Sequence, residues 1–82
     1  MEKTLLINEF LNYFDGVRGI IDPISKVTTM ALGLCDLQAI DNKTLKVILR
    51  RPELLIGEGG KDLKQLEKQL NCKIIIEEKK FV

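Results

Sequence analysis

The chain opens with apolar residues at a helical spacing. Between residues 3 and 14 they recur every three or four positions, which predicts an amphipathic helix with one buried stripe. Asp15 and Gly16 follow, and glycine can adopt the left-handed conformation that ends many helices. We expect the aromatic rings of this stripe to enter the core rather than to stack on bases. The members of the stripe are Leu6, Phe10, Tyr13, Phe14 and Val17.

Residues 17–34 carry a mixed pattern. Asp22 and Pro23 form a good helix start, because aspartate caps a first turn and proline fits its first position. We therefore predict a short helix that ends near Gly33, although the β-branched run at 27–29 favours a strand. The residues expected to be buried in this helix are Ile24, Val27, Ala31 and Leu34.

From residue 35 the apolar period changes to two, which predicts a hairpin with one buried face. Residues 41–44, with the sequence Asp-Asn-Lys-Thr, have the composition of its turn. The positions expected to face the core are Cys35, Leu37 and Ala39 in the first strand and Leu45, Val47 and Leu49 in the second.

The remainder of the chain alternates between helical and strand patterns. Pro52 ends the second strand and starts a short turn of helix over 53–56. Three glycines follow within 57–60, and leucines at helical spacing predict a helix from about Lys61 to Leu70.

Asn71 is a suitable cap for that helix, and a β-branched run predicts a last strand at about 73–79. Because two helices separate this strand from the second one, a crossover connection should place the two strands parallel. The predicted fold class is therefore α+β, with a three-stranded mixed sheet and helices packed on one face.

Length and composition indicate one small globular domain. The chain has 82 residues, of which 45% are hydrophobic and 30% charged. A net charge of +1 provides no large basic field. The charge is uneven, however, because residues 1–40 carry three basic and five acidic side chains, whereas residues 41–82 carry ten and seven. The basic half contains the glycines, which mildly supports a polyanionic partner.

Several functional classes are disfavoured by what the sequence lacks. There is no histidine, the commonest general base and metal ligand, and no pairing of a nucleophile with a base is evident. We expect no enzyme, no catalytic residue, no metal site and no cofactor. Cys35 and Cys72 lack the spacing of zinc ligands and are expected to be reduced. The chain shows neither a signal-peptide pattern nor the ~20 apolar residues of a membrane span, so we expect a cytoplasmic protein that does not contact a membrane.

The stretch from Ile56 to Gly60 is the candidate binding site. A glycine turn before a helix presents N–H groups and the positive end of the helix dipole, which suit a phosphate. Two nucleotide-cofactor motifs fail by spacing: the dinucleotide motif GxGxxG is absent, and Gly60-Lys61 is followed by Asp62 instead of the Ser or Thr of a Walker loop. Alternatively, the glycines only permit tight packing between two helices.

The context of the turn resembles the KH (K-homology) domain, a single-stranded nucleic-acid binder. A strand, Arg51-Pro52, a short helix, an Ile-Gly-x-x-Gly turn, two spaced leucines and a Lys-Ile-Ile-Ile strand carry the resemblance over about residues 44–78. The preceding helix and strand are similar to the type II arrangement of bacterial KH domains, among them that of a small-subunit ribosomal protein. Residues 1–82 would then be one KH-like domain. Its parts would be an N-terminal helix (1–16), an insertion that is either an extra helix or a partner surface (17–34), and the hairpin plus strand–helix–GXXG–helix–strand core (35–80).

The resemblance implies that the turn grips the backbone of single-stranded RNA, with about four nucleotides in the adjoining groove. Ile56 and Leu63 would wall this groove, and the last strand near 73–75 would meet the base edges. The residues implied to bind RNA are Arg51, Ile56, Gly57, Glu58, Gly59, Gly60, Lys61, Leu63, Lys64, Lys73 and Ile75.

Glu58 departs from the family, whose members often carry Lys or Arg inside the loop. A carboxylate there would repel a phosphate by on the order of 1 kcal/mol. Lys61 and Lys64 either compensate for this charge or belong to a solvated helix face. Two functions therefore remain open. One is binding of single-stranded RNA, with single-stranded DNA or ribosome-associated RNA as variants. The other is a KH-fold protein–protein module with weak or lost nucleic-acid binding, whose partner or second copy would use residues 17–34 or the open sheet face.

Overall fold

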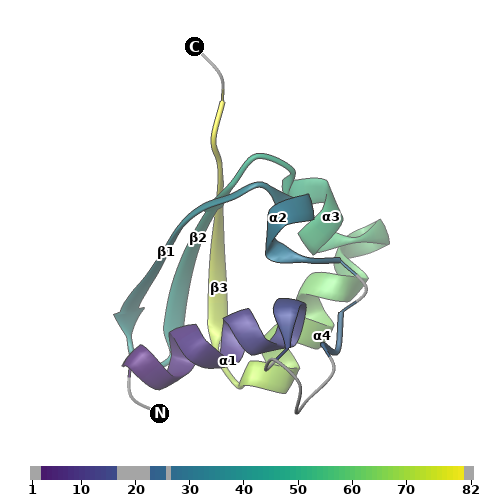
Figure 1. The fold of residues 1–82 in the computed structure, drawn as a ribbon. Coiled ribbons are helices and arrows are strands. Elements are labelled where there is room, and N and C mark those ends of the chain that lie inside the picture. Colours follow the sequence, from purple (N-terminus) through teal and green to yellow (C-terminus); the bar gives the residue numbers. More distant parts are fainter. Residues whose placement is uncertain (1–2, 17–22, 26, 81–82) are drawn as a thin grey trace.

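The computed structural model describes residues 3–16, 23–25 and 27–80, which form an α+β fold (Figure 1). In this part of the chain three strands form one sheet in the order β1-β2-β3. β1 is antiparallel to β2, and β3 is parallel to β2, which confirms the predicted mixed sheet and crossover. The elements in chain order are α1 (Lys3–Asp15), α2 (Thr29–Leu32), β1 (Leu34–Asp41), β2 (Thr44–Leu49), α3 (Pro52–Ile56), the 3-10 turn η1 (Glu58–Gly60), α4 (Lys61–Leu70) and β3 (Lys73–Glu78).

The core lies between the helices and one face of the sheet. Along β2 the buried residues alternate with half-buried ones, so one face of this central strand is fully covered. α1 crosses the strands on the covered side, and α2, α3 and α4 lie beside it (Figure 1). The buried side chains are Leu6, Phe10, Tyr13, Phe14, Leu32, Leu45, Val47, Leu49, Leu55, Leu66, Leu70 and Ile74.

α1 agrees with its predicted pattern. Every described member of the expected stripe is buried, and Val17 lies outside the described residues. The helix ends at Asp15, and Gly16 follows with φ 74°, the left-handed conformation expected of a glycine in this place. The Asp15 carboxylate also accepts hydrogen bonds from Thr29, one from its N–H at 2.9 Å and one from its hydroxyl at 2.6 Å. The end of α1 therefore holds the start of α2.

α2 begins later than the sequence predicts. Residues 23–25 are not helical, and Asp22 lies outside the described residues. The first helical residue is Thr29, because the Thr28 hydroxyl caps the helix by accepting the Ala31 N–H at 3.2 Å. The Thr28 cap is a local contact, whereas the contact of Asp15 with Thr29 joins residues 14 positions apart and is a tertiary effect.

The buried stripe predicted for this segment is only partly correct, since Val27 and Leu34 are half-buried and pack against the core. Ile24 and Ala31 are exposed, Val27 only packs against the edge of the core, and Leu32 takes the buried place. The predicted end of the helix is confirmed, since Gly33 has φ 70° and its N–H donates to the Met30 carbonyl at 3.1 Å.

The first strand corrects one expected core position. Cys35 is exposed, although the alternation assigned it to the buried face. The register between β1 and β2 shifts between Leu34 and Asp36, so Leu34 takes the place of Cys35 against the core, together with Leu37 and Ala39. A bulge of this kind reverses the side-chain alternation on one side of it, which a strict period of two cannot anticipate.

The segments after the hairpin agree closely with the sequence. α3 and α4 form where they are predicted, and Asn71 ends α4 with φ 52°. β3 ends at Glu78, one residue before the predicted limit, and Lys79 still donates its N–H to the Leu49 carbonyl at 2.8 Å. Ile75 lies on the outward face of the sheet and is 39% exposed, and Ile48 is half-buried.

Candidate functional site

α3 delivers the chain to the glycine stretch. Pro52 occupies the first turn of this helix, where its missing N–H has no helical partner to lose, and Leu55 anchors it in the core. The helix ends at Gly57, whose N–H donates to the Glu53 carbonyl at 3.1 Å. Gly57 has φ 75° and ψ 179°, a region that is essentially restricted to glycine.

Gly59 and Gly60 complete the turn. Both have positive φ, 65° and 78°, and the Gly60 N–H donates to the Gly57 carbonyl at 3.3 Å. A Cβ atom added to either residue would meet no other atom within 4 Å. These two glycines therefore serve the backbone conformation, and the surface beside them is open to another molecule.

Gly57 has a second reason to be glycine, which is not apparent from the sequence alone. A Cβ atom placed there would lie 2.5 Å from Oδ2 of Asp62 and 2.6 Å from its Cγ. The Asp62 side chain thus packs directly on the turn from the first turn of α4. The signal in the sequence was an acidic residue near the start of a helix, which is ordinarily explained by the helix dipole alone.

The start of α4 has no side-chain cap. Gly60 is its N-cap residue and has no side chain to accept the N–H groups of the first turn. α4 directs Leu63, Leu66 and Leu70 towards the core, whereas Lys61 and Lys64 are exposed. The Gly60 and Lys61 N–H groups donate to the Gly57 and Glu58 carbonyls within the turn, so the feature that suits an anion here is the positive end of the helix dipole.

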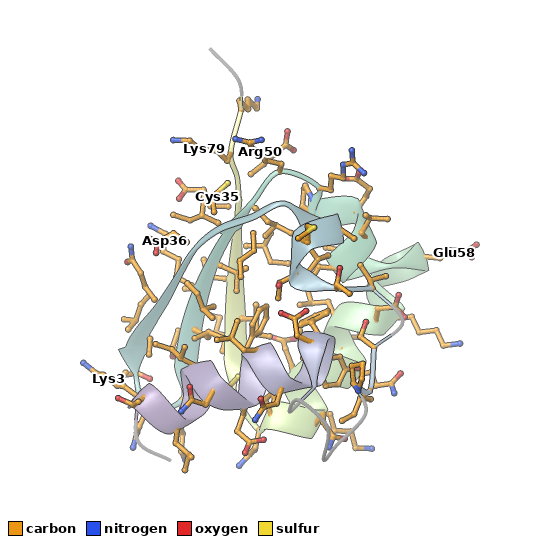
Figure 2. All side chains as sticks on the ribbon, viewed as in Figure 1. Lys3, Cys35, Asp36, Arg50, Glu58 and Lys79 are labelled. Atoms are coloured by element: carbon orange, nitrogen blue, oxygen red, sulfur yellow. The ribbon has the colours of Figure 1, made fainter. Side chains whose placement is uncertain are left out.

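The side chains around the turn contribute no net charge. Residues 51–64 hold three basic and three acidic side chains. Arg51, Lys61 and Lys64 are exposed, and so is Glu58, which projects from the tip of the turn away from the rest of the fold (Figure 2). Attraction of an anion to this site therefore depends on the backbone dipoles, with Lys61 and Lys64 opposing Glu58.

The structure brings eight of the predicted site residues together and places the other three elsewhere. Ile56, Gly57, Glu58, Gly59, Gly60, Lys61, Leu63 and Lys64 form one continuous segment, and Arg51 stands at the opposite end of α3. By the alternation of β3, Lys73 and Ile75 direct their side chains to the outward face of the sheet, opposite the face on which Leu63 packs.

The free edge of β3 is formed by different residues. The N–H groups of Lys73 and Lys79 both donate towards β2, to the carbonyls of Lys43 and Leu49 at 2.8 Å. The even-numbered residues between Lys73 and Lys79 therefore direct their backbone N–H and carbonyl groups away from β2, to the outer edge of the sheet. Ile74 shows this, because its N–H donates to Oε2 of Glu67 at 2.9 Å. Ile76 is the next residue on this edge, and its half-buried side chain packs against the core. The sequence carries no signal for this role, because Ile74, Ile75 and Ile76 are the same residue type.

A cavity of about 240 Å³ lies behind the turn, between the end of α1, residues 24, 25 and 27 and the helices α3 and α4. Tyr13 and Asp62 both line it. Burial, and secondarily the negative charge of Asp62, raise the pKa of the Tyr13 hydroxyl. The remaining lining residues are Phe14, Ile24, Ser25, Val27, Leu54, Leu55 and Gln65.

Within the described ranges, no group of three or more cysteine or acidic side chains is arranged to hold a metal ion. Burial, and next the charge of Glu67, raise the pKa of the Cys72 thiol, which disfavours the thiolate that a metal requires. None of the helices in the part of the chain that the structure describes is both long enough and apolar enough to cross a membrane.

The geometry thus defines a small α+β protein with an open glycine turn between two helices. Comparison of the chain with protein-family models, with curated proteins and with solved structures finds no match.

Proposed function

We propose that the chain is a small, non-catalytic, type II KH-like domain that binds single-stranded RNA through the turn from Gly57 to Gly60. The observation that carries this proposal is the open glycine turn within the order β2–α3–turn–α4–β3, where β3 is parallel to β2. The preceding α1 and β1 supply the additional helix and strand of the type II arrangement. Glycine turns of this kind clamp the backbone of about four nucleotides in KH domains.

A phosphate would lie beside Gly59 and Gly60. The absence of any atom near their missing Cβ positions allows its oxygens to approach the backbone closely. The positive end of the α4 dipole, whose first turn has no side-chain cap, then attracts the phosphate. Lys61 and Lys64, both exposed, supply the counter-charge from the same helix.

The bases would meet the free edge of β3. Ile56 and Leu63, both half-buried, supply the apolar wall, and the backbone of Ile76 presents its donor and acceptor to the base edges. This role passes to Ile76 from Ile75, because the backbone groups of Ile75 are directed to β2. The aromatic side chains within the described residues, Phe10, Tyr13 and Phe14, are buried and do not stack on the bases in this mode.

The affinity of such a site is expected to be modest. Few phosphates are contacted, and Glu58 offsets part of the attraction by about 1 kcal/mol. Binding should weaken with salt, with a slope of about −0.7 per phosphate for a single strand.

The test is a binding selection with a random RNA pool at low salt, comparing the natural chain with a Glu58→Asp, Gly59→Asp double variant. Gly59 is the right position for the disruptive charge, because its φ and ψ of 65° and 16° lie in the left-handed region that aspartate tolerates. The added side chain meets open space, so the variant should remain folded. Retained binding by a folded variant, or no binding by the natural chain to any pool, would contradict the proposal.

The second candidate function is a protein–protein module, and the outward sheet face favours it. Ile75 is 39% exposed there, and Ile48 lies diagonally across the β2–β3 pair. A partner or second copy on this face would leave the turn unused. NMR spectra with RNA separate the two functions: amide shifts confined to residues 56–64 support RNA binding, whereas no shifts together with concentration-dependent self-association support the module.

A further inference from the structure

The cavity behind the glycine turn holds polar side chains that the fold leaves without partners. Tyr13, Asp62 and Gln65 line it, and their side chains form no hydrogen bond or ion pair with any residue that the structure describes. The described residues also contain no buried polar side-chain atom that lacks a partner, so the Tyr13 oxygen must reach solvent. Because Tyr13 is only 9% exposed and lines the cavity, its hydroxyl opens into this cavity. Converging polar groups of this kind are typical of a ligand site.

The charge of the cavity has one sign. Among the described residues that line it, Asp62 is the only one whose side chain is ionised at neutral pH. Burial, and secondarily the charge of Asp62, raise the pKa of Tyr13, so its hydroxyl stays neutral. The described lining therefore carries a negative charge with no positive charge beside it, which favours a cationic ligand.

The cavity also presents apolar surface to water. Ile24 and Leu54 line it although they are 55% and 37% exposed, whereas Phe14 and Leu55 form a buried part of its wall. A ligand with an apolar body would cover the two exposed side chains and gain free energy from the burial of this surface.

The volume of the cavity limits the size of that ligand. An apolar cavity of about 150 Å³ in another protein holds a benzene molecule. The cavity behind the turn, at about 240 Å³, therefore admits one ring with a short substituent.

We propose that this cavity binds a small organic cation, whose ammonium or guanidinium group pairs with the Asp62 carboxylate and whose apolar body lies against Leu54 and Phe14. The pair with Asp62 is a charge-assisted hydrogen bond, and the oxygens of Tyr13 and Gln65 accept the remaining N–H groups of the cation. The site goes beyond the proposed function and does not depend on it.

The experiment measures dissociation constants by NMR titration at neutral pH for three probes. Benzylamine combines a ring with a positive charge, benzyl alcohol has a ring and a similar size without the charge, and methylammonium has the charge without the ring. The natural chain is compared with Asp62→Asn, which keeps the shape of the side chain and removes its charge. The control variant is Glu58→Gln, which removes the same charge from the exposed tip of the turn (Figure 2). Circular dichroism verifies that both variants are folded.

The natural chain should bind benzylamine in the millimolar range, with amide shifts centred on the cavity residues of α1, α3 and α4. Benzyl alcohol should bind about fivefold more weakly, the effect of one ion pair close to water. Methylammonium should also bind more weakly than benzylamine, because it buries no ring. Asp62→Asn should bind benzylamine and benzyl alcohol equally, whereas Glu58→Gln should retain the fivefold difference.

Four results would overturn the inference: no saturable binding of benzylamine, equal affinities for benzylamine and benzyl alcohol in the natural chain, equal affinities for benzylamine and methylammonium, or a preference for the cation that persists in Asp62→Asn. The first three are measured on the natural chain, so they decide the matter even if Asp62→Asn does not fold. None of the four bears on RNA binding by the turn.

Discussion

Replacement of Gly57 by alanine should be the most damaging single-methyl change in the turn. At φ 75° and ψ 179° the backbone lies in a region that other residues hardly occupy, with a strain of roughly 1–3 kcal/mol. The new Cβ atom would also lie 2.5 Å from Oδ2 of Asp62, so one of the two groups must move. We expect the free energy of unfolding to fall by about 3 kcal/mol in total. A domain of 82 residues has about 4–12 kcal/mol to lose.

Gly59→Ala is the matched control, because it adds the same methyl group to the same turn. Gly59 also has a positive φ, 65°, but its Cβ would meet open space. Only the left-handed strain remains, which is about 1 kcal/mol. Urea unfolding gives both values, with circular dichroism as the probe and the fluorescence of Tyr13, the one tyrosine in a chain without tryptophan, as a second.

A double variant separates the two causes of the Gly57 effect. Asp62→Ala alone should cost up to about 1 kcal/mol, since it removes a carboxylate from the first turn of α4. Gly57→Ala combined with Asp62→Ala should be less destabilised than the sum by about 1 kcal/mol, because the clash has been removed. Equal costs of Gly57→Ala and Gly59→Ala, with no coupling to Asp62, would refute the packing described for the turn.

Three further predictions concern charge and titration. Glu58→Lys should tighten RNA binding about fivefold, since about 1 kcal/mol of repulsion is removed, and an unchanged dissociation constant would mean that the turn does not contact phosphate. Asp62→Asn should lower the pKa of Tyr13, although burial still holds this pKa above the ordinary value of 10.0. The near-ultraviolet absorbance of the tyrosinate measures this pKa. An unchanged pKa would mean that the charge of Asp62 does not act on Tyr13. Because the pKa of Tyr13 is raised in the folded state, the contribution of this residue to the free energy of unfolding is complete below pH 10.0. It is lost as the pH rises through the pKa of Tyr13 in the folded state. Cys35 should react with a thiol reagent faster than Cys72, because Cys35 is exposed whereas Cys72 is half-buried with a raised pKa; mass spectrometry identifies the first site modified, and modification of Cys72 first would contradict the packing.

The local patterns of the sequence predicted most of the elements. The helical spacing of Leu6, Phe10 and Phe14, the alternation around Val47 and the cap at Asn71 all correspond to the structure. Each of these signals is contained within a few residues, because the periods of helix and strand and the conformations of caps are local properties.

The sequence predicted the backbone conformation of the candidate site better than it predicted the contacts that the site makes with the rest of the fold. The glycines mark the turn by their conformational freedom, and the turn forms between the two helices that the leucine and proline positions predict. The packing of Asp62 on Gly57 and the free edge at Ile76 depend on how α4 and β3 meet the rest of the fold. Neither contact leaves a pattern in a single sequence.

The amino-acid sequence by itself therefore determined the order and type of the elements and the conformation of the glycine turn, since spacing, caps and glycine act within one segment. Only the tertiary structure decided the contact of Asp15 with the start of α2, the exposure of Cys35 and the packing of Asp62 on Gly57. These features join residues from different elements. Their positions follow from the burial of one shared core and from the register of paired strands, which no local preference specifies.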